Sequence, residues 1–116
     1  MGSVVYVVAT SVEGTREALE VATAWARGVS GRAVLLVPRA EEEHAIRQLA
    51  DVYSPRPDVL ACVWERSIDL LQLVHVSGRV VLGGVSRWGW PTAEERLARV
   101  LTRAGCHVTF AHVPPD

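Results

Sequence analysis

Val80–Thr92, VVLGGVSRWGWPT, is the stretch from which the interpretation of the whole chain begins. A short apolar run leads into two glycines, and a loop with two tryptophans follows before Thr92 opens a helix. A strand that ends in glycines beside a helix N-terminus can hold a phosphate, because the backbone comes close and free N–H groups point at the anion. The residues expected to contact such a ligand are Gly83, Gly84, Ser86, Arg87 and Thr92. A tight strand-to-helix turn with a solvated arginine is the alternative.

Strand-like and helix-like segments alternate along the rest of the chain. The predicted strands are Val4–Ala9, Ala33–Val37, Val59–Val63, Val80–Leu82 and His107–Val113. The predicted helices are Thr15–Arg27, Glu41–Val52, Ile68–His75 and a fourth that runs from Thr92 to Gly105. This alternation predicts an α/β fold, with a parallel sheet covered by helices on both faces, and right-handed crossovers leave few topologies.

The helix sequences contain two further local signals. Glu95 follows Thr92 by three residues, which is the spacing of a capping box. In the first helix, apolar residues recur at helical spacing and predict the buried face. That face would consist of Ala18, Val21, Ala22, Trp25, Ala26 and Val29.

The last strand alternates, unlike the unbroken apolar first strand. Val108, Phe110 and His112 fall on one face, with His107, Thr109 and Ala111 on the other. Such a pattern suits a strand at the edge of the sheet, and an apolar edge strand usually needs a partner.

Size and composition exclude several classes of function. The 116 residues suffice for one domain, and a net charge of −1 gives no electrostatic basis for binding nucleic acid or an anionic membrane. The absence of lysine excludes P-loop and Schiff-base chemistry. The four histidines lack metal-ligand spacing, and no nucleophile with its base is evident, so we expect neither a metal site nor catalytic residues. Without a signal sequence or a long apolar run, a cytoplasmic location is expected.

Both ends of the chain resemble the universal stress protein (UspA-like) family. The stretch VVATSVEGTREAL, 7–19, is similar to the family's strand–loop–helix start, and the segment from Leu82 to Val113 is similar to its glycine loop, last helix and last strand. Gly84-Val85-Ser86-Arg87 is closest to the stress-protein-type domain of potassium-sensing histidine kinases.

The resemblance implies a single three-layer, Rossmann-like domain over residues 1–116, with strand order 3-2-1-4-5 and a homodimer through Val108, Phe110 and His112 of the last strand. It also implies a pocket for ATP, ADP or AMP at the carboxyl ends of the first and fourth strands. Adenine and ribose would lie near Ala9, Thr10, Ser11, Val37 and Pro38, with the phosphates near Gly84–Arg87 and Thr92.

Two functions therefore remain open from the sequence. One is a small regulatory protein that binds an adenine nucleotide as a homodimer. The other is a member without the nucleotide site that acts as a dimerisation or protein-interaction module. Thr10 stands where ATP-binding members carry an aspartate, which favours the second, whereas the Gly-Gly-x-Ser-Arg stretch favours the first. The hydroxyls of Thr10 and Ser11 have two possible roles as well, as ligand contacts or as partners of the loop and helix backbone.

Overall fold

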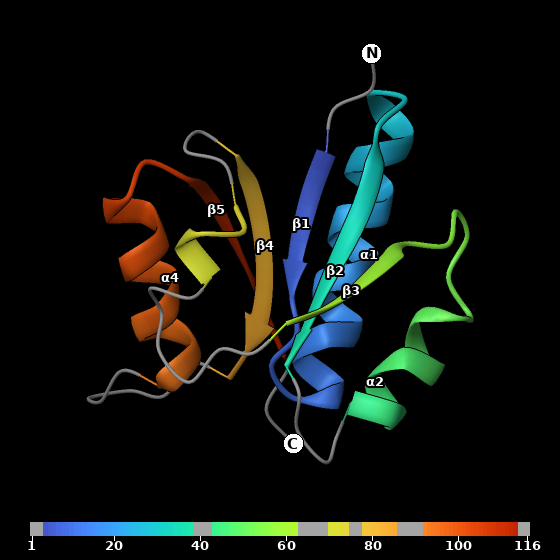
Figure 1. Cartoon of the computed structure of the whole chain (residues 1–116), viewed down its shortest axis with the longest axis horizontal. Helices are drawn as coiled ribbons and strands as arrows, with labels where there is room; N and C mark the ends of the chain where they lie inside the picture. The colour runs from blue at the N-terminus through green and yellow to red at the C-terminus, as the bar shows by residue number, and fades with distance from the viewer. Residues whose placement is uncertain (1–3, 39–42, 63–69, 75–77, 86–91, 114–116) are drawn as a thin grey trace.

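The computed structural model describes residues 4–38, 43–62, 70–74, 78–85 and 92–113. Five parallel strands form one sheet of order β3-β2-β1-β4-β5, which confirms the predicted α/β sandwich and its strand order (Figure 1). The strands are β1 Val4–Val8, β2 Arg32–Pro38, β3 Asp58–Cys62, β4 Arg79–Gly84 and β5 His107–His112. The helices are α1 Val12–Gly28, α2 Glu43–Ala50 and α4 Ala93–Arg103.

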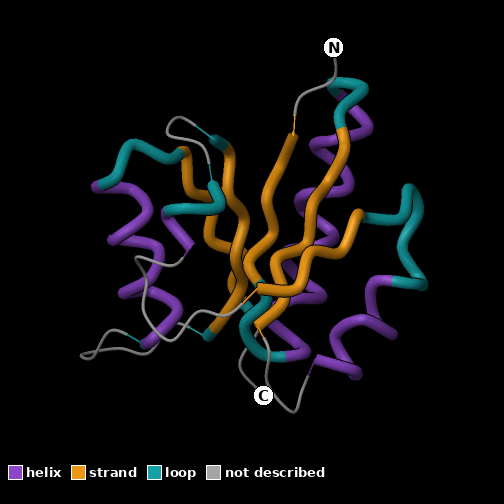
Figure 2. The backbone as a smooth tube through the Cα atoms, in the orientation of Figure 1, coloured by secondary structure: helices purple, strands orange, loops and turns teal. Residues whose placement is uncertain are grey.

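The helices cover both faces of the sheet, as Figure 2 shows. On one face, α1 and α2 pack against the central strands around Leu19, Leu35 and Ile46, which are fully buried. On the other, α4 and the helical turn of residues 70–74 pack around Leu82 and Leu101. Successive residues of a strand point to opposite faces, so the unbroken apolar runs of β1, β2 and β4 supply both cores at once.

Two of the differences from the predicted element boundaries bear on the candidate site. The first helix begins at Val12 rather than at Thr15, because the Ser11 side chain caps it and Gly14 lies in its first turn. The fourth strand continues through both glycines, which pair with Ala111 and His112 of β5 instead of starting a loop. Ladder hydrogen bonds with β5 therefore extend β4 beyond its apolar residues.

The buried face of α1 also differs from the prediction. Val21 and Val29 are 39% and 44% exposed, whereas Leu19 and Thr23 are buried. The buried face is therefore rotated about the helix axis relative to the predicted one. It is centred on two pairs of neighbouring residues, Ala18 with Leu19 and Ala22 with Thr23. Thr23, which the apolar pattern left off the buried face, thus lies within it.

A search of the described helices for a membrane-spanning segment found none with enough length and apolar character.

Candidate functional site

The strand order reverses between β1 and β4, which lie side by side in the sheet. Parallel strands place all their carboxyl ends at one edge, and open α/β sheets bind ligands in the crevice beyond such a reversal. Both α1 and α4 begin at this edge, α1 directly after β1 and α4 after the segment that follows β4 (Figure 1). The nucleotide pocket predicted from the sequence would lie at this edge.

Gly83 and Gly84 are successive residues of β4, so side chains at these positions would point to opposite faces of the sheet. The first turn of α1 packs against Gly83, and the first turn of α4 packs against Gly84. A Cβ atom on Gly83 would lie 2.7 Å from the carbonyl carbon of Gly14 in α1. A Cβ atom on Gly84 would lie 2.9 Å from Cβ of Glu94 in α4. Real Cβ atoms do not come this close. Packing of α1 backbone therefore requires glycine at Gly83, and a side chain at Gly84 would force Glu94 and the start of α4 to shift.

The two hydroxyls at the end of β1 are already engaged with the protein backbone. Thr10 Oγ1 donates a hydrogen bond of 2.6 Å to the Gly83 carbonyl, which joins the ends of β1 and β4. Ser11 Oγ accepts from the N–H of Gly14 at 3.0 Å and caps α1. The backbone N–H of Thr10 donates to Thr15 Oγ1 at 3.1 Å. These contacts are the backbone roles that the sequence left open, and a ligand role for either hydroxyl stays a prediction.

The start of α4 carries the capping box that the sequence predicted. Thr92 Oγ1 accepts from the N–H of Glu95, and Glu95 Oε1 accepts from the N–H of Thr92. That backbone hydrogen bond lowers the pKa of Glu95, with smaller contributions from the charges of Arg99 and His112. A carboxylate thus already occupies the positive end of this helix, next to the position predicted for a phosphate.

The remaining predicted contacts divide into described and undescribed residues. Ala9 is buried, and its N–H donates to the carbonyl of Leu36 at 3.0 Å. Val37 is fully buried, and Pro38 ends β2 half-buried. Ser86 and Arg87, as well as the tryptophan loop, lie outside the described residues. The structure therefore brings Thr10, Ser11 and Gly83 together with Gly14 and leaves the predicted arginine contact untested.

Three residues at this end were missed by the sequence analysis. Gly14 contacts Gly83, Thr15 accepts from Thr10, and the Glu94 side chain covers Gly84. Only Gly14 gave a local signal, because a glycine inside a helix is costly and is kept for close packing. Together these contacts form a tightly connected junction of two helices on one strand.

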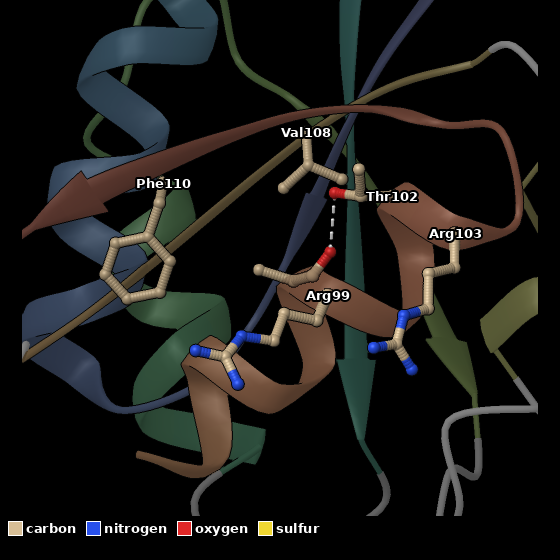
Figure 3. Close-up of a pocket in the computed structure, with 6 residues that line it drawn as sticks. Arg99, Thr102, Arg103, Val108 and Phe110 are labelled. Atoms are coloured by element: carbon tan, nitrogen blue, oxygen red, sulfur yellow. Dashed lines mark hydrogen bonds between the residues drawn. The ribbon is translucent and has the colours of Figure 1, made fainter. Parts of the chain in front are cut away.

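A second candidate surface lies along the outer strand. Two adjacent cavities of about 350 and 220 Å³ run between α4 and β5 and share Ala98, Arg99 and Phe110 as lining residues. Val108 and Phe110 reach from β5 toward α4 (Figure 3). Arg103 lines the larger cavity and Glu95 the smaller. The result is an apolar groove, the α4–β5 groove, with charges of both signs at its rim.

Two contacts within the α4–β5 groove fix its side chains. Thr102 Oγ1 donates to the carbonyl of Ala98 at 2.8 Å, so this hydroxyl is used within α4 (Figure 3). The rings of Phe110 and His112 contact each other, with centroids 4.8 Å apart. The predicted face of the last strand is confirmed, since Val108 and Phe110 pack on the α4 side and Ala111 on the α1 side.

Comparisons with protein-family models, with curated proteins and with solved structures gave no match for this chain. The resemblance to universal stress proteins therefore stays a prediction from the sequence motifs.

Proposed function

We propose that this chain is a homodimeric interaction module that associates through its β5 edge. The observation that carries the proposal is the α4–β5 groove, which runs along the outermost strand of the sheet. The sequence offered this function as the alternative to nucleotide binding. The contacts around Thr10 and Gly83 favour it, because they commit the described polar groups at the other candidate site to the protein itself.

The backbone of β5 supports pairing with a second strand. The N–H groups of His107 and Val113 donate to Gly78 and Gly84, respectively, on the β4 side. Backbone groups alternate in direction along a strand, so those of Val108 and Phe110 point away from β4. Among the described residues, no other strand lies beyond β5. The outward groups form a ready template for an added strand.

Symmetry favours a second copy of this chain as the partner. A twofold axis perpendicular to the sheet would pair two β5 strands antiparallel. If Phe110 lies at this axis, the two strands overlap over their greatest length, and the residues whose backbone groups point outward form hydrogen-bonded pairs. Each Val108 would then lie opposite His112 of the second copy. The two α4 helices would lie antiparallel on the same face, which brings the acidic start of one near the basic end of the other. Glu94 and Glu95 supply the acidic end, and Arg103 supplies the basic end.

Sedimentation velocity over a range of protein concentrations tests this arrangement. We expect a dimer for the wild-type chain and a monomer for Phe110→Lys, because a lysine at the centre of the edge opposes pairing. Leu60→Lys is the matched control, since Leu60 is a 45% exposed residue on β3, the opposite edge strand. Circular dichroism verifies that both variants fold. A wild-type monomer at millimolar concentration, or a dimer in folded Phe110→Lys, contradicts the proposal.

Binding of an adenine nucleotide is a second candidate, favoured by one observation. Two helix N-termini, of α1 and α4, meet the carboxyl ends of β1 and β4 at the reversal of strand order. Helix N-termini attract phosphate. Thermal denaturation tests it: ATP would raise the melting temperature of the wild-type chain and have little effect on that of Arg87→Ala. An unchanged melting temperature with millimolar ATP would exclude this candidate.

A further inference from the structure

Among the described residues of β5, His112 is the titratable side chain on the face that packs toward α4. It is exposed, and it lines the smaller cavity of the α4–β5 groove beside Phe110. The two rings contact each other, with their planes tilted by 54°. Imidazole is the side chain whose charge ordinarily changes between about pH 5 and pH 8. A group that can change its charge near neutral pH therefore lies on the edge that the proposed dimer would cover.

The charged groups that face His112 within its own chain come from α4. Glu95 and Arg99 line the same cavity, and the charges of Glu95 and His112 interact. The side chain of Glu94 lies over Gly84, which is the residue of β4 that pairs with His112. Within one chain the imidazole thus faces two carboxylates and one guanidinium on an exposed surface, where water solvates either of its protonation states.

The proposed dimer would replace that water by hydrocarbon. With Phe110 at the twofold axis, His112 lies directly opposite Val108 of the second copy and diagonally opposite its Phe110. Directly opposite Cβ atoms are about 4.5–5.5 Å apart in an antiparallel pair, and diagonal neighbours are within reach of an aromatic ring. Each imidazole would therefore be covered by apolar side chains of the other copy. Such burial disfavours the charged form of an ionisable group.

The charges brought by the second copy would not compensate for this burial. The antiparallel α4 helices bring Arg103 of the second copy toward Glu94 and Glu95, so a guanidinium competes with the imidazolium for the two carboxylates. Arg99, which lines the same cavity, would be enclosed with His112 and adds a second cation beside it. Like charges in one site disfavour the charged form of a basic group. Both effects act in the same direction as the burial.

We propose that the β5 edge is a pH-controlled interface, in which protonation of His112 separates the two copies. This inference rests on the proposed dimer. Proton binding and assembly are coupled reciprocally, so an assembly that disfavours the imidazolium is weakened by protons to the same extent. The dimer is strongest when His112 is neutral, and it weakens as the pH falls through the range of about 8 to 5 in which imidazole takes up its proton. Twofold symmetry places two such histidines in each dimer, so two protons act together.

Sedimentation equilibrium of the full chain at about pH 8 and about pH 5.5 tests the proposal across this range. Coupling between two binding events is typically about fivefold or more, so two histidines should raise the dissociation constant of the dimer at least about tenfold at the lower pH. His112→Gln, which does not titrate, should give the same dissociation constant at both pH values. His107→Gln is the matched control, because His107 is an exposed histidine on the other face of β5, and this variant should keep the pH dependence. The hydrogen bond from the N–H of Thr92 lowers the pKa of Glu95, so that carboxylate stays ionised throughout.

The outcomes distinguish this inference from the proposed dimer on which it rests. A wild-type dimer with the same dissociation constant at both pH values, or with a lower one in acid, overturns the role of His112 and leaves the dimer in place. The same holds if His112→Gln weakens in acid as much as the wild-type chain does. A wild-type chain that is monomeric at both pH values overturns the dimer and the pH control together. Circular dichroism at each pH verifies that the wild-type chain and both variants are folded.

Discussion

The carboxyl end of β4 and the outer side of β5 are neighbours in the sheet, yet they use their polar groups in opposite ways. Gly84 pairs with His112, so the two regions adjoin each other. At the end of β4, the Thr10 hydroxyl and the Gly83 carbonyl bond to each other. On β5, the backbone groups of alternate residues point away from the sheet. One region is closed by its own contacts, and the other presents groups to a partner.

This difference teaches that a conspicuous motif and an available surface need not coincide. The double glycine and the nearby hydroxyls are typical of a phosphate site, but the described contacts use them to seat two helices on one strand. The α4–β5 groove is lined by residue types that have no distinctive spacing. Its capacity for a partner follows from its place at the edge of the sheet.

The largest effect should come from a side chain placed where the two backbones touch. Gly83→Ala puts Cβ against the carbonyl group of Gly14, and neither backbone can move without displacing α1 from the sheet. We expect the free energy of unfolding to fall by about 3 kcal/mol, at the upper end for overpacking. Urea denaturation measures this change.

Two matched glycine variants show whether the effect is specific to this contact. Gly84→Ala should cost less, about 1–2 kcal/mol, because Cβ meets Cβ and Cγ of a single side chain, Glu94, and a small shift of α4 can relieve the contact. Gly28→Ala has open space around it at the end of α1 and should stabilise by up to about 1 kcal/mol. If Gly83→Ala left the free energy of unfolding unchanged, the double glycine would not be required for packing. That result would favour a phosphate-binding role for it.

A smaller effect is expected from the hydrogen bond that closes the end of β1 onto β4. Thr10→Val keeps the shape of the side chain but removes the donor to the carbonyl of Gly83, a buried residue, and should cost about 1–2 kcal/mol. Thr109→Val on β5 is the control, because Thr109 is exposed and its replacement should change stability by less than about 0.5 kcal/mol. Equal denaturation midpoints for Thr10→Val and the wild-type chain would show that the Thr10 hydroxyl adds no net stability and is available to a ligand.

Local patterns explain why the fold was predictable from the sequence. Unbroken apolar runs such as Val4–Ala9 predicted strands buried on both faces, and the structure has a strand there over Val4–Val8. The capping box of Thr92 and Glu95 spans only three residues, so its spacing was enough to predict both hydrogen bonds. The strand order was implied by the family resemblance and is confirmed by the structure.

Contacts between distant residues were not predictable in the same way. Gly14 and Gly83 touch only because α1 crosses β4, and no local spacing encodes that contact. The burial of Thr23 was not predictable either. A threonine on a helix is usually taken for a surface residue, and its burial depends on how α1 is rotated on the sheet. The candidate site was therefore predictable in place, as the edge where β1 and β4 end, but not in its internal contacts.

The smallest expected effect concerns Glu95, which belongs to both regions. Its carboxylate caps α4 beside β4, and its side chain also lines the α4–β5 groove near His112. The hydrogen bond from the N–H of Thr92 lowers the pKa of Glu95 below its usual 4.5. A lowered pKa in the folded state stabilises the fold above pH 4.5, and that contribution is lost as the pH falls through the lowered value.

Glu95→Gln isolates this charge, because glutamine retains the capping geometry without titrating. The wild-type chain should be slightly more stable than Glu95→Gln at pH 7, and the difference should shrink steadily below pH 4.5. Urea denaturation at several pH values measures it, and a difference that does not change with pH would contradict the assignment. Repeating the series at several protein concentrations separates the two regions. A cap within one chain gives the same difference at every concentration, whereas a charge pair across the β5 edge gives one that grows as dimers form.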